Sequence, residues 1–211
     1  MPWSDDVRVM VSPFRTYREL AKVPDENPWR TAVGRVAFLL LFIATFVSFI
    51  SAGRLVAFHV ASTMVFWAFV PAIQAAVFTI VLRLLGSKGL PGFVKSTGKQ
   101  GGSVSWALGL YFTGHGPWFF FFLFLVAVCF FAPDVYATMM WMVSHGVLPL
   151  LLLGSWVWSG VLTFACFRAG LGFSRGRASG ATALFYLGYA GTIVGYYLAM
   201  NQIQPQVPWA K

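Results

Sequence analysis

Long apolar runs divide the basic residues of this chain, and this pattern limits the fold more than any motif. Five runs contain no Asp, Glu, Lys or Arg: residues 36–53, 61–82, 104–131, 146–167 and 180–200. A helix of about 20 apolar residues crosses the hydrocarbon core of a bilayer. The sequence therefore predicts an all-α, polytopic integral membrane protein with five transmembrane helices.

The positions of the positive charges predict the orientation. Thirteen of the 15 Lys and Arg residues precede the first run or lie between runs two and three or four and five. Arg54 and Lys211 are on the opposite side. By the positive-inside rule, the N-terminus is cytoplasmic and the C-terminus is outside. The net charge of +9 then serves as an orientation signal with anionic lipids as partners, and it does not indicate nucleic-acid binding.

The chain divides into a cytoplasmic leader (residues 1–35), one membrane domain (36–200) and a short outer tail (201–211). In the leader, Ser12 and Pro13 mark a helix start, and the spacing of Phe14, Tyr17 and Leu20 gives that helix an apolar side. We expect an amphipathic helix in the membrane interface. The predicted contacts with anionic lipids are Arg15, Arg18, Lys22, and the loop residues Lys88, Lys95 and Lys99.

The third run contains the candidate functional site. Its Gly114-His115-Gly116-Pro117 segment should break the helix, because proline lacks a backbone donor. Irregular backbone at membrane depth is tolerated only beside protein or water. Tyr111 and His115 are therefore candidates for a buried polar site. The alternative is a structural histidine bonded to a freed carbonyl. No metal-ligand cluster or facing histidine pair is evident, so no cofactor is predicted.

Small residues in the last two runs predict close helix packing. They are Ser155 and Ser159 in the fourth run and Gly188, Gly191 and Gly195 in the fifth. Small side chains at this spacing let helix backbones approach one another. The contact could be internal or between copies, so the sequence leaves homo-oligomers open.

The acidic residues argue against an enzyme. Five of the six precede the first run, and Asp134 lies in a short outer loop. Acid–base catalysis and cation-coupled transport usually need a carboxylate at the site. The sequence therefore predicts a protein without enzymatic activity.

Several motifs stand in a characteristic order along the chain: SPFRTYREL in the leader, GGSVSWALGLYFTGHGPWFFFF in the third run, and the basic turn GLGFSRGRASGATAL before the fifth. In this order the chain resembles the bacterial branch of the Yip (Ypt-interacting protein) family over most of residues 12–200. The acidic motif of eukaryotic members is absent. The resemblance implies a membrane scaffold or adaptor in a bacterial cytoplasmic membrane. Its expected partners are other integral membrane proteins, and it could be an accessory subunit of a larger complex that they form.

Two alternative functions stay open from the sequence. One is a small transporter or channel with a path at the broken third run. The other is a quinone- or haem-binding subunit of a redox complex.

Overall fold

The computed structural model describes residues 4–23, 27–86 and 104–203, and every regular element within these ranges is a helix. The elements are α1 (Ser4–Val11), α2 (Pro13–Leu20), α3 (Pro28–Ala52), α4 (Ala57–Trp67), α5 (Phe69–Gly86), α7 (Val104–Thr113), α8 (Gly116–Phe131), α9 (Val135–Ser144), α10 (Val147–Ala165), the π-helix η1 (Cys166–Gly170) and α11 (Arg175–Ile203).

Three helical stretches are long and apolar enough to cross a membrane: Pro28–Ala52, Ala57–Leu85 and Val147–Gly170. The α7–α8 pair meets the same criteria as one span bent by 46°. The described residues thus hold three candidate spans, or four with the bent pair, and these overlap the first four predicted runs. The fifth run lies in α11, which has 29 residues but is not among the candidate spans. The prediction of five spans is therefore not confirmed.

The first span begins earlier than the apolar run that predicts it. Pro28 occupies the first turn of α3, and the Asn27 side chain accepts a hydrogen bond from the backbone N–H of Arg30 at 3.2 Å. Such an N-cap satisfies a donor that the first turn leaves free. The helix consequently contains Arg30 and Arg35, which the hydropathy pattern assigned to the leader.

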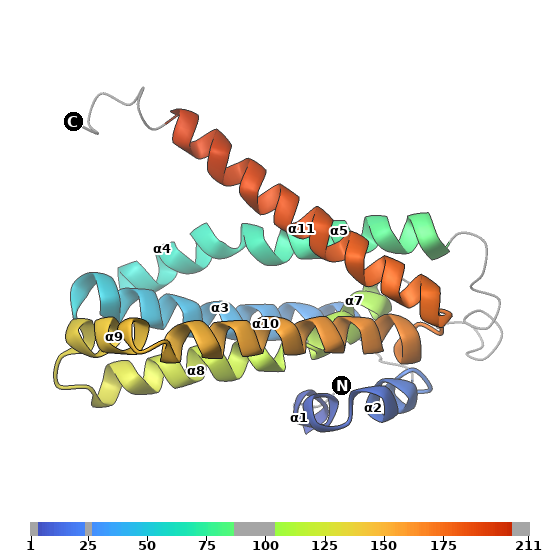
Figure 1. Cartoon of the computed structure of the whole chain (residues 1–211), viewed down its shortest axis with the longest axis horizontal. Coiled ribbons are helices and arrows are strands. Elements are labelled where there is room, and N and C mark those ends of the chain that lie inside the picture. Colours follow the sequence, from blue (N-terminus) through green and yellow to red (C-terminus); the bar gives the residue numbers. More distant parts are fainter. Residues whose placement is uncertain (1–3, 24–26, 87–103, 204–211) are drawn as a thin grey trace.

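Helix α3 packs against α4, α7 and α8, and in Figure 1 the α4–α5 arm runs above it and α8 below it. The break between α4 and α5 at Ala68 is followed by Pro71, whose missing N–H cannot continue the helical bonding pattern. Helix α11 crosses α5, and its C-terminal half extends away from the bundle.

The main hydrophobic core joins α5, α7, η1 and the start of α11. Phe78 is fully buried and stacks on Tyr111 and on Phe167, with ring centroids 4.6 and 5.2 Å apart. A second, smaller cluster joins α8 and α9 through residues such as Phe121, Leu125 and Met142. The larger cluster surrounds the break between α7 and α8, so it fixes the surroundings of the candidate site.

Helices α1 and α2 form a compact unit, the leader hairpin (residues 4–20), that packs against α7, α8 and η1. The predicted amphipathic helix is present as α2, with Pro13 in its first turn. Its apolar side differs from the expectation, because Tyr17 and Leu20 are buried against protein. Phe14 is partly exposed, with an exposed fraction of 40%, so the apolar surface left for lipid is small.

Candidate functional site

The helix between Tyr111 and Pro117 is interrupted where the sequence predicts. The N–H groups of Gly114 and His115 bond to the carbonyls three residues earlier, those of Tyr111 and Phe112, at 3.0 and 3.2 Å. These tight turns replace the usual four-residue bonds. Pro117 follows in the first turn of α8, where its lack of an N–H is tolerated. The result is the 46° bend between α7 and α8.

The two glycines of the break let the leader hairpin approach the backbone. A Cβ atom added to Gly114 would lie 2.5 Å from the hydroxyl oxygen of Tyr17, and one added to Gly116 would overlap the side chain of Met10. A larger residue at Gly114 would have to displace the buried Tyr17, whereas at Gly116 the flexible end of Met10 would have to move. The two glycines therefore allow α1 and α2 to pack closely against the α7–α8 junction, and they also favour the break in the helix.

Tyr17 is the centre of this contact. Its side chain is fully buried, and its ring lies beside Gly170 of the π-helix, where an added Cβ would be 3.6 Å from Tyr17 Cδ1. Desolvation by this burial raises the pKa of the Tyr17 hydroxyl well above its usual value, so the side chain stays neutral. The neighbouring Thr16 hydroxyl donates to the Arg8 carbonyl at 3.0 Å and ties α2 to α1.

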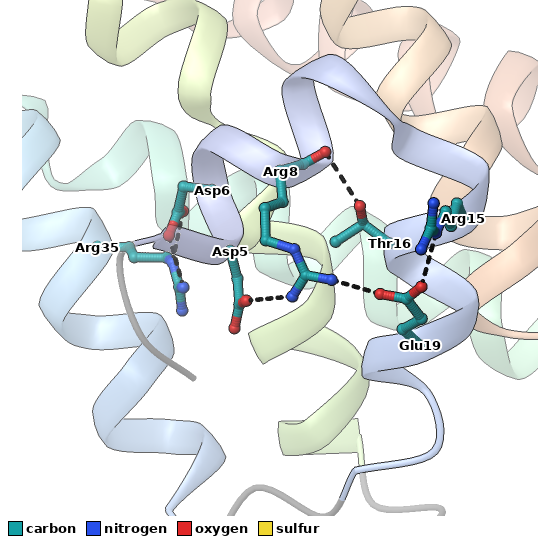
Figure 2. A network of polar contacts seen from close by, with 7 residues as sticks. All are labelled: Asp5, Asp6, Arg8, Arg15, Thr16, Glu19 and Arg35. Carbon is teal, nitrogen blue, oxygen red and sulfur yellow. Dashed lines mark hydrogen bonds and ion pairs between the residues drawn. The ribbon is translucent and has the colours of Figure 1, made fainter.

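A buried ion pair joins the hairpin to α3 (Figure 2). Asp6 accepts hydrogen bonds from Nε and Nη2 of Arg35, both at 2.7 Å. The Arg35 side chain is 5% exposed and that of Asp6 is 14% exposed. Desolvation raises the pKa of Asp6 above its usual value, although the hydrogen bond and charge of Arg35 oppose that rise. This geometry makes the pair a strong positional link, since both charges are largely shielded from water and removing either one would leave the other uncompensated.

The outer face of the hairpin has a second, exposed network. Arg8 donates to Asp5 at 3.3 Å and also pairs with Glu19, which accepts from Arg15 Nε at 2.9 Å. The pKa of Glu19 is lowered, and the hydrogen bond from Arg15 is the largest cause. Arg8, Arg15 and Glu19 are solvated, whereas Asp5 is buried. The pairs among the solvated groups add less to stability than the buried pair does.

A cavity of about 190 Å³ lies beside the break. It is bordered by α3, α5, the α7–α8 junction, α10 and α11. Most of its wall is aromatic or aliphatic, and its polar members include Gln74, His115, Ser159 and Thr163. No Asp or Glu is among the described residues that line it. Such a wall suits a small apolar molecule with one or two hydrogen-bonding groups.

His115 is held in this wall by a residue from α5. Its Nε2 lies 3.2 Å from Oε1 of Gln74, and its ring packs edge-on against Tyr111 with centroids 5.0 Å apart. The other ring nitrogen, Nδ1, is buried and has no partner of hydrogen-bonding distance and angle within the described chain. His115 is thus a positioned side chain that also interacts with the Tyr111 backbone, while its Nδ1 makes no hydrogen bond of normal geometry within the described chain.

The structure brings part of the predicted site together. Tyr111, Gly114 and His115 line the cavity, whereas Gly116 and Pro117 are buried beside it and Gly116 faces Met10. Sequence reasoning missed Gln74, because an isolated glutamine in an apolar run gives no sign of its partner. It also placed Arg35 in the leader, and no sequence signal indicated that Asp6 would reach it.

The predicted packing residues fall into two groups. Ser159 is buried in the cavity wall, while Ser155, one turn earlier, is half-buried and outside it. Gly188 touches α5, since an added Cβ would lie 3.0 Å from Cγ1 of Val77. Gly191 and Gly195 have no heavy atom within 4 Å of an added Cβ among the described residues, so these two glycines make no close internal contact.

The predicted lipid contacts are only partly described. Arg18 and Lys22 are exposed on and just after α2, and Arg15 is exposed but pairs with Glu19. Lys88, Lys95 and Lys99 lie outside the described residues. Within the described ranges, no three His, Cys, Asp or Glu side chains are grouped as metal ligands. Cys129 and Cys166 are both buried as free thiols.

Comparisons with known protein families, curated proteins and solved structures give no match for this chain.

Proposed function

We propose that this protein is a non-enzymatic scaffold or adaptor of a bacterial cytoplasmic membrane, with α11 as the helix that binds other membrane proteins. The observation that carries the proposal is the unpacked C-terminal half of α11. The C-terminal half of the helix leaves the bundle (Figure 1), and the side chains of Val194 and Leu198 have exposed fractions of 57% and 59%. A helix that projects in this way has area available for a partner.

The small residues on this half favour a helix as the partner. Gly191 and Gly195 are one turn apart and face open space. In membranes such a pair allows the close backbone approach that drives helix association. The partner in this proposal is another integral membrane protein, and a second copy of the chain is the competing outcome.

The proposed topology has five crossings with a cytoplasmic N-terminus. The arrangement in Figure 1 supports it, because the leader hairpin, the end of α5 and the start of α11 lie toward one end of the bundle while the α3–α4 turn lies toward the other. Arg83 and Arg175 belong to the first end, and Arg54 belongs to the α3–α4 turn. This distribution agrees with the positive-inside rule. The Yip-like assignment is part of the proposal and rests on the sequence motifs.

The test is purification from native membranes into nanodiscs, followed by mass spectrometry of bound proteins. We expect stoichiometric partners with the wild type, and their loss from a Gly191→Leu/Gly195→Leu variant. The matched control is Gly154→Leu on α10, where an added Cβ also meets open space and the partners should remain. A single species from wild-type membranes would refute the scaffold function, and a complex made only of this chain would change the proposal to self-association.

Small-molecule transport is a second candidate because the cavity lies at the break of a candidate span. A flux assay with His115→Ala tests this function. Loss of flux in a folded variant would support it, and unchanged flux would remove His115 from the path.

A further inference from the structure

The cavity beside the helix break has the size of a ring with small substituents. Its volume is about 190 Å³. An engineered apolar cavity of about 150 Å³ in another protein binds benzene, and typical drug-sized ligands occupy about 300 Å³ or more. Aromatic side chains from five helices, among them Phe112, Trp118 and Phe185, border the space. These walls favour a planar apolar ring.

The charge of the wall favours an uncharged ligand. Arg35 is the one charged side chain among the described lining residues, and Asp6 already accepts hydrogen bonds from two of its nitrogens. A ligand cation would meet no carboxylate in the wall. A ligand anion would have to compete with Asp6 for Arg35 in a largely dehydrated site.

Two residues of the wall, Ser159 and His115, each have a buried polar atom without a hydrogen-bond partner in the described structure. A ligand group that bonds to these atoms would have to be polar. Ser159 is 7% exposed, and its Oγ has no hydrogen-bond partner in the described structure. Helical Ser and Thr hydroxyls commonly bond to the carbonyl four residues earlier, as Thr163 does to Ser159 at 2.8 Å. Ser159 itself does not, and Nδ1 of His115 is likewise buried without such a partner.

The pairing of His115 with Gln74 indicates what the ligand must offer. In the tautomer whose Nε2 donates to Oε1 of Gln74, 3.2 Å away, Nδ1 presents a lone pair. A hydroxyl group can donate to Nδ1 and accept from the Ser159 hydroxyl, whereas a carbonyl or an ether can only accept. We propose that this cavity binds an uncharged, ring-sized molecule that carries a hydroxyl, that is, a phenol-type or hydroquinone-type ligand held by His115 and Ser159.

This inference goes beyond the scaffold function and requires no transport. Its test uses the full-length protein in nanodiscs and ¹⁹F NMR titration with 4-fluorophenol and 4-fluoroanisole. The two probes have nearly the same shape, but the anisole has no hydroxyl hydrogen. Empty nanodiscs measure partitioning into lipid. We expect saturable binding of the phenol, about tenfold tighter than that of the anisole.

Two variants locate the binding. Ser159→Ala should remove most of the preference for the phenol, while Ser155→Ala, one turn away and outside the cavity, should retain it. Ser159→Leu should fill the cavity and abolish saturable binding of both probes. If Ser159→Leu does not fold, the preference measured with Ser159→Ala decides the question. Equal affinity for both probes, or no saturable binding above empty nanodiscs, would overturn the proposal.

A further arm identifies the source of the ligand. A hydroquinone with an isoprenoid tail, added to the nanodisc lipid, is compared with the free hydroquinone. Tighter binding of the tailed form would assign the site to a membrane-resident quinol headgroup, and exclusion of the tailed form would assign it to a free solute. Loss of protein partners from α11 variants would leave these titrations unchanged, so failure of this site is distinguishable from failure of the scaffold function.

Discussion

Replacing Arg35 by methionine should release the leader hairpin from the bundle. In the native protein, Asp6 accepts two hydrogen bonds of 2.7 Å from Arg35, and both side chains are nearly shielded from solvent. Methionine has a similar length but no charge, so the Asp6 carboxylate would be left buried without its counter-ion. The hairpin can relieve this only by moving Asp6 into water or by protonating it.

The expected size of the effect follows from the burial of the pair. Removing one member of a buried ion pair typically costs about 3–5 kcal/mol. Each 1.4 kcal/mol is about a factor of ten in an equilibrium constant, so the opening equilibrium of the hairpin should rise by about two orders of magnitude or more. Replacing both members by apolar residues, as in Asp6→Leu/Arg35→Met, should recover most of this loss, because no charge then remains buried.

Hydrogen exchange in nanodiscs measures this opening directly. The amides of α1 and α2 report local opening free energy, and those around the fully buried Phe78 report global unfolding. Arg15→Ala is the control, since it removes a charge of the exposed network and should leave the protection of the hairpin unchanged. If Arg35→Met exchanges no faster than Arg15→Ala, the buried pair does not hold the hairpin and the reasoning fails.

Other predictions follow from the close contacts and from burial. Gly114→Ala should undock the hairpin, because the new Cβ would lie 2.5 Å from the hydroxyl oxygen of the buried leader tyrosine; Gly154→Ala, with open space around it, should preserve hydrogen-exchange protection. Phe78→Ala should lower the free energy of unfolding by about 3–5 kcal/mol, and Ile80→Ala, at a 54% exposed position, by less than about 1 kcal/mol, as measured by equilibrium denaturation. The raised pKa of Asp6 means that the docked hairpin binds a proton more tightly than the undocked one. Docking should therefore be strongest below the usual aspartate pKa of 3.8, weaken as pH rises through the raised pKa and then stay constant. The mobility of a nitroxide label in the α1–α2 turn checks this, and a pH dependence that persists in Asp6→Asn would contradict it.

Much of the helical architecture could be predicted, because apolar runs report membrane crossings directly. The break before Pro117 was also predictable, since proline and glycine act on the backbone locally. The true start of α3 at Pro28 was not found by hydropathy, although Asn27 and Pro28 carry an N-cap signal. Charge in the first turns of α3 masked it.

The candidate site was predictable only as far as local signals extend. Gly114 and His115 were found from the interruption that they cause, but the links to Gln74, Arg35 and Asp6 depend on tertiary packing. Tyr17 gave a misleading signal, since an apolar helix side suits lipid and protein equally well. Only the structure shows that it faces protein.

The docking of Tyr17 beside Gly114 and Gly170 has a consequence for biosynthesis. Helices α1 and α2 leave the ribosome before α7, α8 and η1, so the binding surface of the leader is complete only after the α7–α8 break and the π-helix have been made. During synthesis α1 and α2 therefore remain undocked, with their apolar side exposed, while the third and fourth candidate spans insert. Closing such a distant contact is slow compared with helix formation. The hairpin should thus dock late, in a step that joins α1 and α2 to segments about 100 to 150 residues further along the chain.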